Sequence, residues 1–229
     1  MSLLDRELAV FDLETTGVDV RTARIVTACV AVLDASGAVV ARRDWLADPG
    51  VEIPEGAAAI HGITTERARA EGRPAAEVVA EVVGELRAQL AAGRPLVVYN
   101  APYDLSLLAA EAARHGVATL VDPAPVIDPL VLDKAVDRYR KGKRTLEVAA
   151  VHYGVTLDGA HDAAADAIAA GQVARALAAR HAAALPETLD ELHAAQARWH
   201  DQQADNFENY MRTQRDHTFT ADRGWPVRG

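Results

Sequence analysis

The chain has 229 residues, of which 50% are hydrophobic and 25% are charged. These proportions are typical of a soluble globular protein with one α/β domain, and they exclude a disordered chain. The formal net charge of −9 argues against a broadly basic nucleic-acid binder, because phosphates attract Lys and Arg. It fits either a small-molecule or protein partner, or acids clustered around metal ions. The single cysteine, Cys29, excludes an intramolecular disulfide and a cysteine-based metal site.

The sequence carries no sign of export or of membrane insertion. Residues 1–14 include Asp5, Arg6 and Glu7 and have no long apolar run, so no signal peptide is expected. No apolar stretch is long enough to span a bilayer. We therefore expect a cytoplasmic protein without a membrane partner. The apolar neighbours of Cys29 predict that its side chain is buried.

The N-terminal part predicts three strands joined as an antiparallel meander. Residues 8–13 and 25–34 are rich in β-forming side chains, and residues 39–46 form a third such run. The Ala-Ser-Gly sequence at 35–37 supplies a tight turn between the second and third strands.

Helices and strands are predicted to alternate farther along the chain. Apolar residues at helical spacing predict a helix over 74–92 that ends at Gly93. The later elements are a strand at 95–99, a helix at 102–115, a strand at 126–127, and helices from about 129, at 145–153 and at 161–184. This order predicts an α/β fold in which a mixed sheet is flanked by helices.

Pro186 marks the expected end of the main domain, so we assign residues 1–185 to one domain and 186–229 to a C-terminal appendage. Apolar residues near heptad spacing over 189–211 predict an amphipathic helix. The helix is expected to pack on its own domain, with a partner or dimer surface as the alternative. Trp225-Pro226 would either anchor the tail or lie in a disordered end.

The first candidate functional motif lies at the end of the first strand. Strand side chains alternate between faces, so Asp12 and Glu14 point to one side and Phe11 and Leu13 to the other. Two adjacent carboxylates at a buried strand end are costly unless they are paired or bound to metal. The alternative is a strand end with solvated acids. The turn at 15–17 would let backbone approach a ligand closely.

Two further motifs lie at the starts of helices. In Asn100-Ala-Pro-Tyr-Asp104, a buried strand ends and Asp104 sits in the first turn of a helix, where it either complements the helix dipole or binds a metal. In His161-Asp-Ala-Ala-Ala-Asp166, the alanines leave space for a close approach. Asp162 is expected to be a capping or solvated acid, and a lone His161 would more often be a surface or core residue.

Together these segments resemble the three exonuclease motifs of the DnaQ-like superfamily, the DEDD 3′→5′ exonucleases. The matching residues are Asp12 and Glu14, Asn100 to Asp104, and His161 to Asp166, with the histidine subclass marked by His161. The segment Ile-His-Gly-Ile-Thr at 60–64 also resembles these proteins, which include the proofreading epsilon subunit of bacterial DNA polymerase III. The resemblance covers about residues 7–180 and departs mildly at Tyr103, where Phe is more usual.

The resemblance implies a ribonuclease H-like fold and a site for two Mg²⁺ ions, which Mn²⁺ would replace. Hard oxygen ligands suit both ions. Asp12 would bridge the two metals, Glu14, Asp104 and Asp166 would complete the protein ligands, and His161 would be the general base. The implied reaction is metal-dependent hydrolysis at the 3′ end of DNA, with release of nucleoside 5′-monophosphates.

Substrate contacts are predicted less directly. Thr15 and Thr16 follow the first motif and are positioned to bond the terminal nucleotide, and His61 matches a position that approaches it in some relatives. A surface-loop role for His61 is the alternative. The densest basic run comprises Arg138, Arg140, Lys141, Lys143 and Arg144. It either grips the nucleic-acid backbone or is a solvated charge run.

Alternative functions use the same residues or the same fold. The five motif residues would serve equally on RNA 3′ ends or short oligonucleotides, and the motifs do not decide between DNA and RNA. A non-catalytic scaffold would instead dock a polymerase or a second copy through the C-terminal helix. A proofreading subunit combines both ideas and requires a separate polymerase partner. A phosphoesterase acting on small nucleotides is the remaining alternative.

Overall fold

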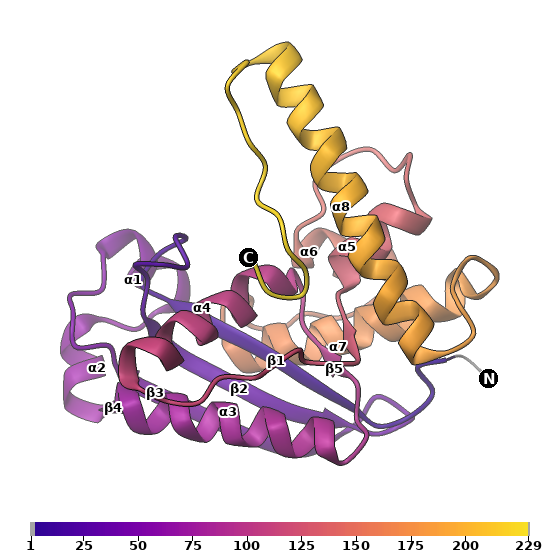
Figure 1. Cartoon of the computed structure of the whole chain (residues 1–229). Coiled ribbons are helices and arrows are strands. Elements are labelled where there is room, and N and C mark those ends of the chain that lie inside the picture. Colours follow the sequence, from indigo (N-terminus) through magenta and orange to yellow (C-terminus); the bar gives the residue numbers. More distant parts are fainter. Residues whose placement is uncertain (1–2, 229) are drawn as a thin grey trace.

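The computed structural model describes residues 3–228 and is built on a six-stranded mixed sheet (Figure 1). The strand order is β4-β3-β2-β1-β5-β6. The strands are β1 (Leu8–Thr15), β2 (Ile25–Leu33), β3 (Val39–Asp48), β4 (Arg73–Pro74), β5 (Leu96–Val97) and β6 (Val126–Ile127). The first three pair antiparallel, whereas β5 and β6 run parallel to β1. This is the predicted arrangement of a meander followed by alternating strands and helices.

Helices cover both faces of the sheet. The α-helices before the appendage are α1 (Glu55–His61), α2 (Thr65–Glu71), α3 (Ala75–Ala91), α4 (Ala101–His115), α5 (Pro129–Val136), α6 (Leu146–Tyr153) and α7 (Ala163–Arg180). The apolar cluster on one face joins α3 and α4 to the sheet, and the cluster on the other face joins α7 to it. A short 3-10 helix (Ala182–Ala184) follows α7, so the helix predicted over 161–184 is divided in two.

The alternation of β1 divides its residues between these two clusters. Ala9, Phe11 and Leu13 pack with α3 and α4, as predicted, whereas Leu8 and Val10 pack with α7. Cys29 is fully buried, which confirms that prediction. Because Asp12 and Glu14 share the parity of Leu8 and Val10, they point to the α7 side of the sheet.

Glycine lets α7 approach the strands closely. A Cβ atom added to Gly171 would lie 2.5 Å from Val10 Cγ1, which is closer than nonbonded carbons can approach. Small residues on this part of α7 therefore set its distance from β1, and that distance also places the acidic start of α7 beside the acidic end of β1.

Two short helices and β4 lie between β3 and α3, where no element was predicted. Gly62 ends α1 in the left-handed conformation, with φ of 75°, and the Thr64 side chain caps α2 by accepting from the Arg67 amide. Ile63 between them is buried in a small third cluster. The segment Ile-His-Gly-Ile-Thr therefore contains a helix-stop signal followed by a helix-start signal.

The C-terminal residues form α8 (Leu189–Gln214) and a return tail. Thr188 and Glu191 make a reciprocal capping box at the start of α8. The first half of the helix packs against the edge of the sheet, where Gln196 donates to the Val126 carbonyl and accepts from the Asp128 amide. The second half projects from the body, and the tail runs back beside it (Figure 1).

Trp225 anchors the C-terminal tail, which was one of the two alternatives predicted for this segment. Its indole packs against His193, with ring centroids 4.9 Å apart, and its Nε1 donates to Asp128 Oδ2 at 3.4 Å. The predicted packing of the C-terminal helix on its own domain is thus confirmed for its first half. Within residues 3–228, no helix is both long and apolar enough to cross a membrane.

Candidate active site

The end of β1 presents two carboxylates on the α7 side of the sheet. Asp12 and Glu14 are each partly buried and lie opposite Cys29 and Thr27 in the β1–β2 ladder. The ladder register shifts directly after Glu14, where β1 ends. The backbone amide of Leu13 between them donates to Asp104 Oδ1 at 3.1 Å. This bond ties the first motif to the second.

Asp104 is carried into the site by the start of α4. Asn100 adopts the left-handed conformation, with φ of 64°, and turns the chain sharply from β5 into the helix. Asn tolerates this region better than most residues do. Pro102 occupies the first turn, where its missing N–H costs no hydrogen bond. Asp104 is 3% exposed, so its carboxylate is buried beside β1 rather than solvated at the helix end.

The start of α7 brings the third motif to Glu14. Ligand atoms of Glu14, His161 and Asp166 all lie within 4.8 Å of one another. The His161 amide donates to Asp166 Oδ2 at 3.3 Å, and His161 itself has a left-handed φ of 68°. Its ring is about half exposed and its Nε2 lies 3.6 Å from Glu147 Oε1 of α6. Asp162 caps α7 through the Ala164 and Ala165 amides, which confirms its predicted capping role.

All four carboxylates have raised pKa values, and burial is the largest cause in each case. Burial raises the pKa of Asp12 well above its ordinary value, and Asp104, Asp166 and Glu14 raise it further. Burial likewise raises the pKa of Glu14 to about 8, with added repulsion from Asp166. Burial raises the pKa of Asp104, although the hydrogen bond that its carboxylate accepts from the Leu13 N–H acts to lower it. The pKa of Asp166 is raised by burial, while the His161 N–H opposes it.

These features fit a site for divalent cations. Oδ1 of Asp166 is buried and has no hydrogen-bond partner among the residues described. The other available donor atoms are carboxylate oxygens and one imidazole nitrogen, a set that suits Mg²⁺ or Mn²⁺. Like charges held together in this way are stable only when they are protonated or bound to cations. The residues present therefore match what a metal centre requires.

Asp128 supports the site and was not singled out from the sequence. Its fully buried carboxylate accepts from the amides of Asn100 and Ala101, each at 3.0 Å, and from Leu130 at 2.9 Å. These bonds fix the turn that leads to Asp104 and also cap α5. The signal was present, because an Asp directly before a Pro is a common helix start.

The residues predicted to contact substrate lie around this cluster. The Thr15 hydroxyl bonds to the Gly17 carbonyl and to the Tyr103 hydroxyl at 2.6 Å, and the Thr16 hydroxyl accepts from the Arg24 amide. A hydroxyl has one donor and two acceptor positions, so both retain acceptor capacity. Tyr103, where Phe was expected, thus uses its hydroxyl to hold the turn after the first motif.

His61 lies at the end of α1, and only one of its two ring nitrogens has a hydrogen-bond partner among the described residues. Its Nδ1 accepts from the Ile63 amide at 3.2 Å, whereas its Nε2 is buried without a hydrogen-bond partner among the described residues. Burial lowers the pKa of His61, although the nearby Thr15 carbonyl opposes this. The imidazole shares a pocket of about 430 Å³ with the start of α7.

The basic residues of the run at 138–144 have two different environments in the structure. Arg140 and Arg144 both pair with the buried carboxylate of Asp133, and Arg144 also donates to backbone carbonyls. These two residues are therefore used to fold the loop, which corrects the prediction that the whole run grips nucleic acid or is simply solvated. Arg138, Lys141 and Lys143 remain exposed.

Comparison with known proteins places the chain in a family. Residues 9–174 match the family RNase_T, described as Exonuclease, and this range contains all four carboxylates and His161. The chain belongs to this exonuclease family. The resemblance to DnaQ-like exonucleases is thereby confirmed, and α8 and the tail lie outside the matched residues.

Curated relatives include DNA polymerase III proteins. The chain is 31% identical over 176 residues to the PolC-type DNA polymerase III of Lacticaseibacillus paracasei, covering 76% of this chain and 11% of that protein. It is 32% identical over 167 residues to a DNA polymerase III subunit epsilon-like protein of Rhodobacter capsulatus, covering 71% and 22%. The chain therefore spans only a small part of the length of these relatives.

Solved structures confirm the fold class. The chain superimposes on exonuclease I of E. coli in complex with a dT13 oligonucleotide with a TM-score of 0.62 at 20% identity, covering 74% of this chain and 40% of that chain. The corresponding values for exonuclease I from Methylocaldum szegediense are 0.62 and 23%, with 77% and 41% covered. At these identities the likeness establishes the ribonuclease H-like exonuclease fold.

Proposed function

We propose that the protein is a metal-dependent 3′→5′ exonuclease that hydrolyses the terminal phosphodiester bond of DNA and releases nucleoside 5′-monophosphates. The observation that carries the proposal is the convergence of Asp12, Glu14, Asp104 and Asp166 from three elements into one partly buried cluster with raised pKa values. Membership of the exonuclease family supports this reaction class.

Two divalent ions, Mg²⁺ or Mn²⁺, would be held by Asp12, Glu14, Asp104 and Asp166. Bound there, such ions would supply activation of the attacking water and stabilisation of the leaving oxygen. The chain's own task is to hold the four carboxylates together and to orient them. The Leu13 amide orients Asp104, and the His161 amide orients Asp166.

His161 is proposed as the general base. Its ring stands at the exposed rim of the cluster, close to Glu14 and Asp166, where an attacking water would be reachable. Histidine exchanges protons near neutral pH, which suits this task. Glu147 Oε1 lies 3.6 Å from the Nε2 atom of this ring, on the side of α6.

Substrate positioning is proposed for Thr15, Thr16 and His61. The Thr hydroxyls lie in the turn directly after Glu14, and His61 lines a pocket beside the start of α7. The names of the curated relatives and the DNA oligonucleotide in the exonuclease I structure favour DNA. They also favour action in the cytoplasm beside a polymerase, as in proofreading, with RNA as the alternative substrate.

The test is hydrolysis of matched single-stranded DNA and RNA oligonucleotides that carry a 5′ label. With Mg²⁺ or Mn²⁺ we expect a ladder that shortens from the 3′ end, faster on DNA, and no ladder in EDTA or with Asp12→Asn. A faster RNA ladder would make RNA the substrate. If folded protein with added metal shortens neither polymer, the proposed function is wrong, and hydrolysis of small nucleotides becomes the next test.

A further inference from the structure

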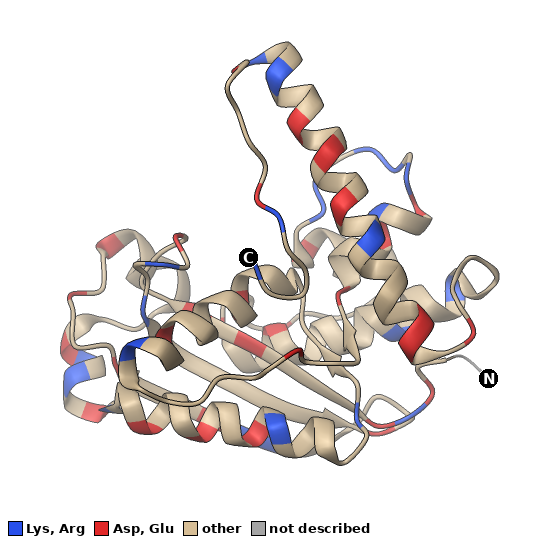
Figure 2. Ribbon diagram, viewed as in Figure 1, with Lys and Arg blue, Asp and Glu red and all other residues tan. Residues whose placement is uncertain are grey.

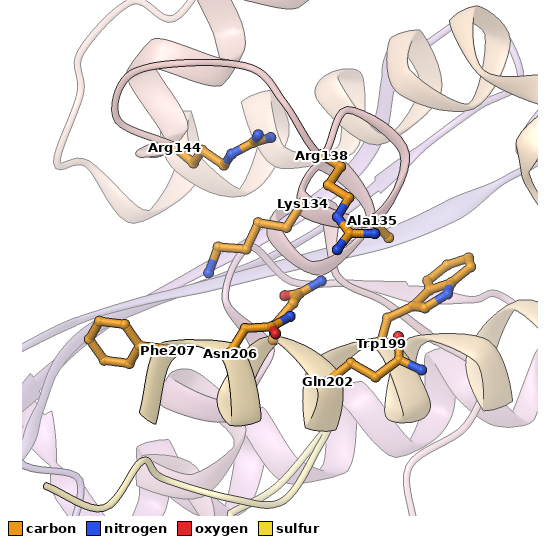
Figure 3. A pocket seen from close by; sticks show the side chains of 9 residues that line it. Lys134, Ala135, Arg138, Arg144, Trp199, Gln202, Asn206 and Phe207 are labelled. Atoms are coloured by element: carbon orange, nitrogen blue, oxygen red, sulfur yellow. The ribbon is translucent and has the colours of Figure 1, made fainter. Parts of the chain in front are cut away.

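A groove lies between α8 and the segment formed by α5 and the loop after it (Figure 3). We call it the α5–α8 groove, and its volume is about 610 Å³. Lys134, Arg138 and Arg144 line one wall, whereas Trp199 and Phe207 belong to α8 on the other. In Figure 3 the Lys134 and Arg138 side chains extend toward α8 in the space between these two aromatic rings.

The charge of the groove is opposite to that of the chain. None of the described residues that line it is Asp or Glu, although the net charge of the protein is −9. Arg144 is neutralised by Asp133. Lys134 and Arg138 are exposed, and neither forms an ion pair with any residue in the described part of the chain. Figure 2 shows Lys and Arg gathered along the same loop. The groove therefore complements a polyanion.

The α8 wall offers aromatic rings and amides. Trp199 and Phe207 are eight residues apart, which corresponds to roughly 12 Å along a helix. Gln202 and Asn206 lie between them on the groove side. Phe207 is 51% exposed even though its ring meets Phe219 edge to face at 5.3 Å. Trp199 is partly buried and packs against the core beside α7, so it presents only part of its ring to the groove. Accessible aromatic surface beside cations is the combination that binds single-stranded nucleic acid, because bases stack while cations hold phosphates.

The groove leads to the candidate active site. An adjoining pocket of about 380 Å³ shares Lys134 and Phe207 with it and extends to Asn100, the residue that begins the Asp104 turn. On its other side, the loop after α5 leads into α6, where Glu147 lies beside His161. Asn100 thus lies between the Asp104 turn and this adjoining pocket, on the route that a strand with its 3′ end at the carboxylates would take to the α5–α8 groove.

We propose that the α5–α8 groove binds the single-stranded DNA that precedes the scissile 3′ nucleotide, with Lys134 and Arg138 on phosphates and Phe207 and Trp199 stacked on bases. This inference rests on the proposed exonuclease function. An apolar protein segment is disfavoured as the occupant because the unpaired cations on the α5 wall face the rings of α8 across the groove, where a partner's apolar side chains would bury them without counter-charges. The groove uses α8, which lies outside the family match.

The test measures affinity of the full-length protein for a labelled single-stranded DNA of about twelve nucleotides, in EDTA so that no hydrolysis occurs. Arg138→Glu and Phe207→Ala are the groove variants. Arg198→Glu and Tyr210→Ala are matched controls, because Arg198 is exposed, Tyr210 is 54% exposed, both lie on α8, and neither lines the groove. All four changes are at exposed positions, so the fold should persist, and circular dichroism checks this.

We expect Arg138→Glu to weaken binding roughly tenfold and to lower the salt slope by about 1, because one phosphate contact is lost. Phe207→Ala should weaken binding about 5-fold or more without changing the salt slope. The controls should bind as the parent does. Equal losses in groove and control variants, no loss in either, or no binding by the parent would each overturn the groove proposal.

The same measurements keep this proposal separate from the proposed function. A parent that shortens DNA while Arg138→Glu binds normally retains the exonuclease and refutes the groove. A parent that binds through the groove but shortens no polymer retains the groove and refutes the exonuclease. A repeat with single-stranded RNA shows whether the groove discriminates; tighter binding of RNA through the same residues would overturn DNA as the occupant.

Discussion

Two sets of buried carboxylates in this protein have opposite surroundings. Asp128 and Asp133 are both 0% exposed, and the protein satisfies them completely, with backbone amides around Asp128 and with Arg140, Arg144 and Tyr153 around Asp133. Burial would raise the pKa of Asp133, but Arg144, Tyr153 and Arg140 hold it below its ordinary value. Burial does raise the pKa of Asp128, although the amide hydrogen bonds oppose the rise.

The four carboxylates of the candidate active site have different surroundings. No Lys or Arg among residues 3–228 forms an ion pair with Asp12, Glu14, Asp104 or Asp166. The pKa values of Asp12 and Glu14 are raised by burial and by the charges of neighbouring carboxylates. A fold that supplies two Arg partners for Asp133, yet supplies no Lys or Arg within residues 3–228 for these acids, has placed them where an external cation completes them.

The largest difference should appear in activity. Asp12→Asn keeps the shape of the side chain but removes the charge that the other carboxylates surround, so we expect the rate of 3′-end hydrolysis to fall roughly 10³-fold or more. Stability in EDTA should be unchanged or higher, because repulsion is relieved. Quantitative single-turnover kinetics on 5′-labelled DNA measures the first effect. An active Asp12→Asn protein would contradict the assignment.

His161→Asn should reduce the rate by about 10²- to 10⁴-fold while metal affinity changes much less, because a general base acts on the water. The matched control is His193→Asn, since His193 accepts a bond from the Val126 amide far from the cluster. Rate constants measured at saturating Mn²⁺ and DNA provide the test. If excess Mn²⁺ restores the rate of His161→Asn, the residue is a metal ligand rather than the base.

Neutralising an acid that the protein already satisfies, such as Asp133, should lower stability, whereas neutralising an acid of the candidate active site should not. Asp133→Asn leaves Arg140 and Arg144 without their counter-charge, so we expect the free energy of unfolding to fall by about 2–3 kcal/mol. Asp104→Asn should not lose stability in EDTA. Urea denaturation of both variants measures the difference, and equal losses would remove the distinction between the two sets.

A further effect concerns pH. Glu14 titrates at about 8 in the folded protein against an ordinary value of 4.5, so the folded state holds the extra proton between these values. Its contribution to stability is therefore full below about pH 4.5 and is lost as pH rises through about 8. In EDTA the melting temperature should fall over this range. Glu14→Gln should flatten the trend, and Mg²⁺ should oppose it by binding the ionised form.

The elements that position the site were predictable because their signals are local. Alternation along 8–13 assigned Asp12 and Glu14 to one face, and glycines and prolines marked the ends of α4 and α6. The short helices α1 and α2 were missed because each has only seven residues and α1 buries no side chain, which leaves no apolar period to detect.

Long-range partners were beyond the reach of the sequence pattern. Nothing near Arg140 and Arg144 indicated that they pair with a buried Asp133, so the basic run read as one exposed patch. The anchoring of Trp225 depends on Asp128, which lies 97 residues away. The metal-ligand roles of the four carboxylates remain predictions, although the structure brings their elements together.

Calorimetric titration of the full-length protein with Mn²⁺ tests the central claim most directly. The parent and Asp133→Asn should both bind Mn²⁺, and Asp104→Asn should bind it at least about tenfold more weakly while remaining folded, because only Asp104 belongs to the unsatisfied cluster. A parent that binds no Mn²⁺, or an Asp104→Asn protein that binds it as the parent does, would contradict the account.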